Sequence, residues 1–146
     1  MTEACILPDY REVPEEAFEI LKETRTIALV GASPKPERPS HQVMKYLLAQ
    51  GFEVIPVNPG QREILGKPCY PRLSAIPPEQ KIDTVVIFRR AEMVPPIVEE
   101  ALKGGIKNIW LQEGIVSEEA RALARKAKAR IVMGLCIKKV HSLSQA

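Results

Sequence analysis

The chain alternates short, continuous runs of apolar residues with longer segments whose apolar residues recur every three or four positions. A continuous apolar run is typical of a strand buried on both faces, and recurrence at three and four positions is typical of an amphipathic helix. The runs predict strands at Thr26–Val30, Phe52–Val57, Thr84–Phe88, Asn108–Leu111 and Arg130–Met133. The periodic segments predict helices at Pro14–Lys22, Ser40–Gln50, Val94–Leu102 and Ser117–Lys126.

This alternation of strand and helix predicts an α/β, Rossmann-like doubly wound fold. Right-handed crossovers would give a five-stranded, mainly parallel sheet with helices on both faces. The length, 146 residues, is that of one domain, so we expect a single domain over 1–146, with residues 1–24 as an N-terminal helical strap. The Pro-rich stretch from Leu65 to Pro78 predicts a loop with a short helix or strand, and the residues after Met133 predict a polar tail.

The predicted topology also predicts where a ligand would bind. In parallel sheets of this type, ligands lie beyond the carboxyl ends of the strands, where the strand order reverses. The loops after Val30, Val57, Phe88 and Leu111 are therefore expected to converge on one site.

The loop after the first strand, Gly31 to Ser40, has the residues of a phosphate site. Gly31 allows close approach of the backbone, Ser40 is expected to be the N-cap of the next helix, and the turn amides would add to the positive helix end. Ser33 contributes a hydroxyl, and Lys35 and Arg38 contribute charge. The pattern favours a phosphate or pyrophosphate, although a glycine here can also serve the turn alone.

Two common nucleotide motifs are missing from this loop. The dinucleotide fingerprint G-x-G-x-x-G is absent, and the second strand ends in Val57-Asn58-Pro59 without the acidic residue that binds ribose hydroxyls. The P-loop pattern is also absent. These absences disfavour NAD and an ordinary ATPase or GTPase.

Composition and charge limit the classes of partner that we expect for this protein. The net charge is only +3, and the basic residues are spread along the chain, so the densest run, residues 125–130, is read as a solvated helix face and not as a nucleic-acid surface. The three cysteines have no motif spacing and are expected to be reduced. No secretory leader or membrane-spanning run is recognised, so we expect a cytoplasmic protein without a membrane partner.

No catalytic constellation is recognisable. The candidates are Cys69, Cys136, His41, His141 and Glu113. Their spacing matches no nucleophile or acid–base motif, the histidines are expected in solvent or capping roles, and the cysteines as small buried side chains. No metal is expected, because no paired ligand motif is present.

Several segments in order resemble a known family: GASPKPERPS after the first strand, VIPVNP after the second, then LGKPCYPRLSAIP, VVIFRR and WLQEG. They resemble the CoA-binding protein family, the small stand-alone relatives of the nucleotide-binding domain in the succinyl-CoA synthetase alpha subunit. The resemblance extends from Thr26 to His141. It implies a Rossmann-like fold and coenzyme A as the cofactor.

The resemblance also implies roles for individual residues. Those expected around the phosphates of coenzyme A are Gly31, Ala32, Ser33, Lys35 and Arg38, with the helix at Ser40 aimed at them. Those expected around the rest of the ligand are Val57, Asn58 and Pro59 at the adenosine, Phe88 at the adenine or pantetheine, Arg89 or Arg90 at a phosphate, and Gln112 in the pocket wall.

One position departs from the family pattern. Relatives commonly carry Asp-Arg or Asn-Arg before the cysteine near the end, whereas this chain has Gly134-Leu135 before Cys136. The contact of that arginine is lost, and Lys138 or Lys139 could replace it.

The expected function is binding of coenzyme A or an acyl-CoA, without catalytic machinery, in a carrier, sensor or accessory role; the protein partner is unknown. Two alternatives stay open. The first is an NAD(P)- or acyl-CoA-dependent enzyme with an unrecognised site, and the second is a structural protein whose nucleotide pocket has decayed.

Overall fold

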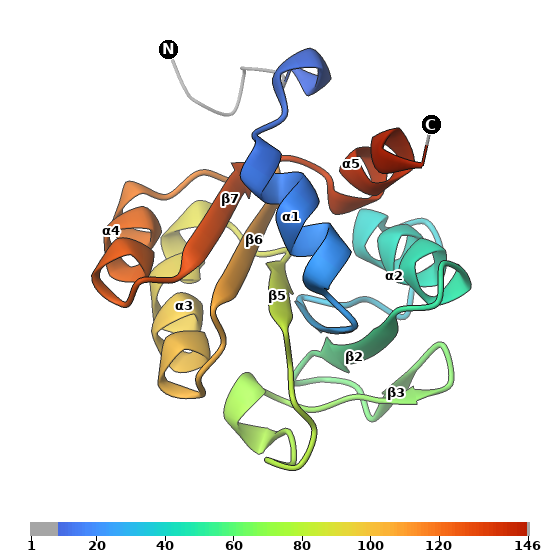
Figure 1. The fold of residues 1–146 in the computed structure, drawn as a ribbon. Coiled ribbons are helices and arrows are strands. Elements are labelled where there is room, and N and C mark those ends of the chain that lie inside the picture. The colour runs from blue at the N-terminus through green and yellow to red at the C-terminus, as the bar shows by residue number, and fades with distance from the viewer. Residues whose placement is uncertain (1–8, 146) are drawn as a thin grey trace.

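The computed structural model describes residues 9–145 and has a five-stranded sheet at its centre (Figure 1). The strands are β1 (Thr26–Val30), β2 (Glu53–Val57), β5 (Thr84–Ile87), β6 (Asn108–Glu113) and β7 (Arg130–Gly134). Their order is β2-β1-β5-β6-β7, and every neighbouring pair is parallel. The order reverses at β1, which confirms the predicted doubly wound α/β fold.

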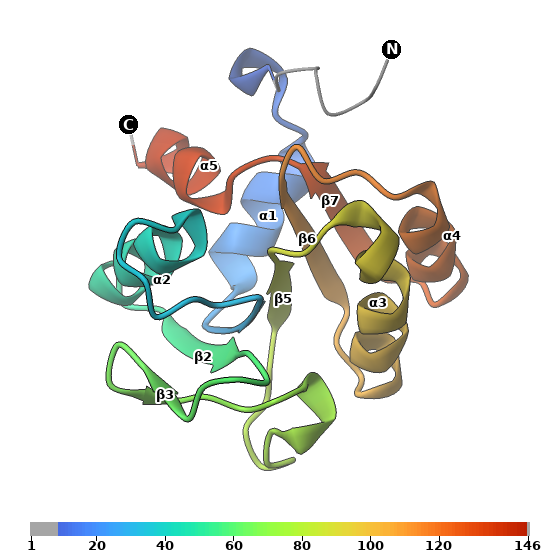
Figure 2. The same cartoon turned by 180° about the vertical axis from the view of Figure 1, so that it is seen from behind.

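Helices cover both faces of the sheet (Figures 1 and 2). On one face lie α1 (Glu15–Glu23), α2 (Pro39–Ala49) and α5 (Ile137–Ser144), and on the other lie α3 (Val94–Lys103) and α4 (Glu118–Lys126). Ser117 forms the N-cap of α4, and its hydroxyl accepts a hydrogen bond from the N–H of Ala120 at 3.1 Å. This cap satisfies one of the free amides at the helix start.

Successive residues of each central strand point into opposite cores. In β1, Ile27 and Leu29 pack under α1, α2 and α5, whereas Ala28 and Val30 pack under α3 and α4. The side-chain period of two in a strand requires both faces to be apolar when both are covered. This explains why the strands appear in the sequence as continuous apolar runs.

The C-terminal end differs from the prediction. The expected polar tail is wrong, because residues 137–144 form α5, which contacts α1 and α2. Ile137, Val140 and His141 are its buried residues. The helix is short, and one of its three buried positions is a histidine. Its sequence therefore has no clear apolar periodicity, and the pattern predicts a polar segment.

The Pro-rich stretch contains more structure than one element. It contains β4 (Lys67–Pro68), which pairs antiparallel with β3 (Glu63–Ile64) just before the stretch, and a 3-10 turn, η3 (Leu73–Ala75). A further 3-10 turn, η4 (Ala91–Met93), precedes α3, and another, η2 (Tyr10–Glu12), precedes α1. Residues 1–8 of the expected strap lie outside the described residues, and α1 packs against β7 and α5.

Candidate functional site

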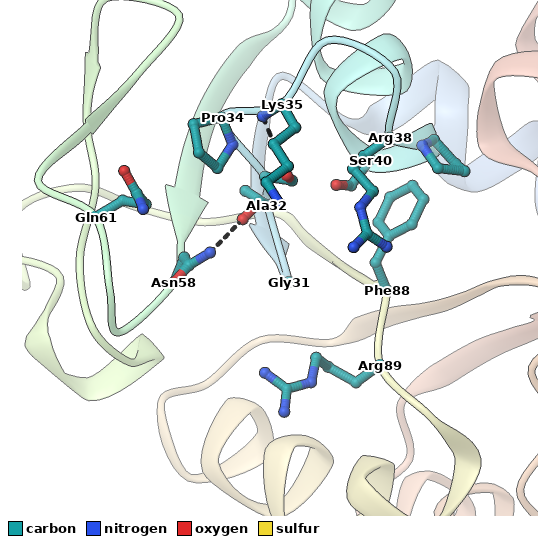
Figure 3. Close-up of a pocket in the computed structure, with 12 residues that line it drawn as sticks. Gly31, Ala32, Pro34, Lys35, Arg38, Ser40, Asn58, Gln61, Phe88 and Arg89 are labelled. Atoms are coloured by element: carbon teal, nitrogen blue, oxygen red, sulfur yellow. Dashed lines mark hydrogen bonds between the residues drawn. The ribbon is translucent and has the colours of Figure 1, made fainter.

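A cavity of about 450 Å³ lies at the carboxyl ends of β1, β2 and β5, where the strand order reverses (Figure 3). The lining residues are Gly31, Ala32, Ser33, Pro34, Lys35, Arg38, Pro39, Ser40, Asn58, Gln61, Phe88 and Arg89. They come from three loops that are distant in the sequence. We call this the polar cavity.

Gly31 is required by the close approach of two strand ends. Its φ is +89°, and a Cβ built on it would lie 2.4 Å from the carbonyl oxygen of Phe88. Only glycine combines this dihedral with this space at low cost. The turn therefore needs Gly31 whether or not a ligand binds beside it.

The amides at the start of the loop are used within the protein. The N–H groups of Gly31 and Ala32 both donate to the carbonyl oxygen of Val57, at 3.0 and 3.3 Å. The side-chain amide of Asn58 donates to the carbonyl oxygen of Ala32 at 2.6 Å. The expectation that the first turn offers free amides is therefore wrong for these two residues, because both amides are hydrogen-bonded to the end of β2.

The start of α2 provides other donors. Pro39 begins the helix and Arg38 occupies the N-cap, so the prediction of Ser40 as the N-cap is wrong. Ser40 is only 5% exposed and lines the cavity. Within residues 9–145, neither its hydroxyl nor its N–H donates to a protein acceptor, and the N–H of Ser33 does not either.

Local hydrogen bonds fix the shape of the loop between Ser33 and α2. The N–H of Lys35 donates to the hydroxyl oxygen of Ser33 at 3.2 Å, and the N–H of Arg38 donates to the carbonyl oxygen of Lys35 at 3.0 Å. The Nδ1 atom of His41 lies 2.9 Å from the carbonyl oxygen of Ser33. His41 thus ties α2 to the loop.

The charge of the polar cavity is positive. Lys35, Arg38 and Arg89 line it, and no lining residue is acidic. The stem of Arg89 passes close to Gly31, and its Nη2 donates to the sulfur of Met93 at 3.1 Å. In Figure 3, Arg38 comes from the loop before α2 and Arg89 from the loop after β5. Such a set of donors suits an anion.

A second cavity, of about 420 Å³, adjoins the first at Arg89, which lines both. Its walls are Val30, Val57, Pro59, Pro71, Arg72, Leu73, Arg89, Glu92, Met93, Pro96, Ile97 and Glu100. Most of these side chains are apolar, so we call it the apolar cavity. Two of the residues predicted to border an adenosine, Val57 and Pro59, lie here, and the third, Asn58, lies in the polar cavity.

Two predicted residues are not brought to either cavity. Arg90 is exposed and lies 3.9 Å from the carboxylate of Glu92. Gln112 is 4% exposed, and its Oε1 accepts a hydrogen bond from the N–H of Ile137 at 2.9 Å. Gln112 therefore supports the start of α5. It was expected to complete the pocket wall, but it lines neither cavity.

Sequence reasoning missed Gln61 and Arg72 among the lining residues. Gln61 follows a turn in which the carboxamide oxygen of Asn58 accepts from the N–H of Gly60 at 2.8 Å. The Asn-Pro-Gly sequence predicts this turn, but the side to which Gln61 points depends on the three-dimensional path of the loop. Arg72 reaches the site because its segment runs beside β2.

The catalytic candidates lie outside the two cavities. The sulfur of Cys69 lies 3.6 Å from the carbonyl oxygen of Asn58, and burial raises the pKa of this thiol. His141 is buried, and its Nδ1 lies 2.7 Å from the Tyr46 hydroxyl. Cys136 is buried before α5. Within residues 9–145 no three His, Cys, Asp or Glu side chains are grouped to hold a metal ion.

Glu113 belongs to a cluster at the end of β6. The Tyr10 hydroxyl donates to its Oε2 at 2.6 Å, and the Lys139 ammonium donates to the same oxygen at 2.9 Å. The hydrogen bond from Tyr10 is the main cause that lowers the pKa of Glu113. Burial is the main cause that raises the pKa of Tyr10. Lys139 is therefore committed to a carboxylate.

Gly134 and Leu135 have structural roles. Gly134 has a φ of +79°, and Leu135 is buried in the core beneath α2 and α5. The Leu135 carbonyl oxygen accepts the indole N–H of Trp110 at 2.8 Å. Leu135 therefore packs in the core at the position where the family resemblance implied an arginine.

A model of a protein family described as a CoA binding domain matches residues 25–142, which includes every lining residue of both cavities. The chain belongs to this CoA-binding domain family. Its relatives include YneT of Bacillus subtilis, described as uncharacterized, which is 39% identical over 130 residues that cover 89% of this chain and 95% of YneT.

The family relatives also include part of a larger enzyme. The ADP-forming acetate–CoA ligase I of Archaeoglobus fulgidus is 29% identical over 128 residues, which cover 81% of this chain but only 18% of the ligase. Among solved structures, a hypothetical protein from Pyrococcus horikoshii OT3 superimposes with a TM-score of 0.87 at 40% identity, over 97% of this chain and 98% of that one. The CoA-binding domain thus occurs both alone and within ligases.

No helix in the described part of this chain is both long and apolar enough to span a membrane.

Proposed function

We propose that this protein binds coenzyme A or an acyl-CoA in the two adjoining cavities. The observation that carries the proposal is their arrangement: a cationic cavity with uncommitted serine donors meets an apolar cavity at Arg89. Coenzyme A has the matching order of groups, a pyrophosphate next to an adenosine. Membership of the CoA-binding domain family supports the same ligand.

The pyrophosphate is assigned to the polar cavity. Ser33 and Ser40 supply hydroxyl and amide donors, and Arg38 supplies a guanidinium at the start of α2. Donors of this kind at a helix start stabilise an anion, and charge-assisted bonds are the stronger ones. The Ser40 hydroxyl, which lines the polar cavity and makes no hydrogen bond within residues 9–145, is the feature that fits a phosphate oxygen.

The adenine is assigned to the apolar cavity. Val30, Val57 and Ile97 offer apolar side chains against which a base can pack. Glu92 and Glu100 on its wall are acceptors for the exocyclic amino group of adenine. The ribose then lies near Pro59 on the wall of the apolar cavity, next to Asn58 of the polar cavity.

We further propose that the protein binds its ligand without performing a reaction. None of the candidate nucleophiles and acid–base groups lines either cavity: Cys69, Cys136, His41, His141 and Glu113. Turnover of an acyl-CoA by the purified protein would contradict this proposal and favour the enzyme alternative.

Isothermal titration calorimetry tests the binding proposal. We expect saturable binding of CoA to the full chain, no heat with NAD or ATP at the same concentrations, and a Kd raised at least about tenfold in Arg38→Ala, because a hydrogen bond to a charged group is worth about 1.5–3 kcal/mol. Arg62→Ala is the matched control, since Arg62 is exposed and lines neither cavity. Absence of CoA binding in the wild type would refute the proposal and favour a decayed pocket.

A further inference from the structure

The end of β2 lacks the group that normally recognises an unmodified ribose. In dinucleotide-binding sheets an acidic residue at this position binds the ribose hydroxyls, whereas a nearby arginine accommodates a ribose phosphate. Here β2 ends in Val57 and is followed by Asn58 and Pro59. Recognition of the ribose would therefore require a residue from another segment.

A second segment runs alongside this strand end. Tyr70 pairs with Val57 in a parallel bridge, its N–H donates to the carbonyl oxygen of Pro56 at 3.1 Å, and its carbonyl oxygen accepts from the N–H of Asn58 at 2.9 Å. Beyond this single bridge, the residue two positions after Tyr70 lines the same cavity as Pro59, which lies two positions after Val57. That residue is Arg72.

Arg72 lines the apolar cavity together with Pro59 and Leu73. It is exposed, and within residues 9–145 it forms no ion pair and its guanidinium makes no hydrogen bond. The other cation of this cavity, Arg89, donates a hydrogen bond to the sulfur of Met93 and also lines the polar cavity. Arg72 is thus the uncommitted cation on the ribose side.

The carboxylates of the apolar cavity do not neutralise Arg72. Glu100 accepts the N–H of Ser74 at 3.0 Å, and Glu92 faces Arg90 at 3.9 Å. Neither contacts Arg72 within the ion-pair distance of 4.0 Å.

We propose that Arg72 binds the phosphate ester on the adenosine ribose and makes the site select ribose-phosphorylated adenine nucleotides. The proposal rests on the proposed function and names the 3′-phosphate of coenzyme A as its ligand group. A 2′-phosphate, as in NADP, has the same chemistry, so the experiment distinguishes the two sources. A guanidinium fork suits either ester.

The test compares CoA with dephospho-CoA on the wild type, Arg72→Ala and the control Arg62→Ala by calorimetry. We expect the wild type to bind CoA at least about tenfold more tightly than dephospho-CoA. Arg72→Ala should lose this preference by weakening CoA binding while the Kd for dephospho-CoA changes less than about twofold. Arg62→Ala should keep the preference, and Arg72→Lys should keep part of it.

Equal weakening of both ligands in Arg72→Ala, or equal binding of both by the wild type, would overturn the role of Arg72 and leave CoA binding intact. Tighter binding of NADP than of CoA, lost in Arg72→Ala, would assign the residue to a 2′-phosphate and overturn the 3′ assignment. Absence of binding for all of these ligands would refute the proposed function itself. A thermal melt of each variant confirms that it is folded before titration.

Discussion

At the scale of single residues, Gly31 joins the fold to the candidate site. Its positive φ turns the chain out of β1, and the absence of a side chain lets the carbonyl group of Phe88 approach. The stem of Arg89 lies against the same position. A change at Gly31 therefore acts on stability and on the shape of both cavities.

Gly31→Ala is expected to destabilise the protein by more than about 2 kcal/mol, because it adds a backbone clash to an unfavourable dihedral. Gly51→Ala is the matched control: Gly51 has a φ of +95°, but nothing lies within 4 Å of the position that its methyl group would take. Its cost should be about 1 kcal/mol. Urea unfolding of both variants measures the difference, and equal losses would contradict the role of the close approach.

The sequence allowed us to predict which residues lie at the site, but not all of the contacts that they make. Ser33, Lys35 and Arg38 were expected near a ligand because they follow the first strand, and the structure places them in one cavity. Their roles toward a ligand stay predictions. The role of Ser40 could not be predicted, because Pro39 also suits the first helical position, and local sequence does not decide between these helix starts.

At the scale of elements, each predicted strand overlaps one in the sheet, with end differences of at most two residues. Burial on both faces makes each strand a continuous apolar run, which is a strong signal. The helix α5 was missed because its buried face includes His141, a residue that sequence patterns count as polar. The resemblance to the family assigned Gln112 to the pocket wall, whereas its hydrogen-bond partner is the first residue of α5, Ile137.

The contact between α2 and α5 is expected to depend on pH. Burial lowers the pKa of His141, which packs edge-on against Tyr46 and Phe52. When the folded-state pKa of a histidine is depressed, the unfolded chain binds more protons as the pH falls below its own pKa of about 6.5, and the folded state loses stability. Above that pH the effect is absent.

Thermal unfolding at pH 7 and pH 5 tests this expectation. The wild type should have a lower Tm at pH 5, and His141→Gln should show a smaller decrease between the two pH values. The comparison uses the change with pH, so a general loss of packing in the variant does not affect it. An identical decrease in both proteins would show that His141 is not responsible.

At the scale of the whole molecule, Tyr10 connects the two ends of the described chain. Its hydroxyl donates to Glu113 at 2.6 Å and accepts from the N–H of Cys136 at 2.8 Å, and the Lys139 ammonium lies 5.4 Å from the centre of its ring. One hydroxyl therefore joins η2 to the ends of β6 and β7 and to the start of α5.

Tyr10→Phe is expected to lower the free energy of unfolding by about 1–2 kcal/mol, because it leaves the Cys136 N–H and the Glu113 carboxylate without this partner. Amide hydrogen exchange at Cys136 should become faster. Tyr70→Phe is the control, since the Tyr70 hydroxyl makes no hydrogen bond within residues 9–145. Equal stability of the two variants would mean that the hydroxyl of Tyr10 contributes little.

The single carbonyl oxygen of Val57 that accepts two amides has a consequence for how such a protein can evolve. Those amides are bound to β2, so under the proposed function the choice of ligand would depend on side chains that line the two cavities, such as Arg38 and Arg72. Each of these can be replaced by a single mutation that leaves the sheet and its cores unchanged. Natural selection can therefore alter what the pocket holds without putting folding at risk.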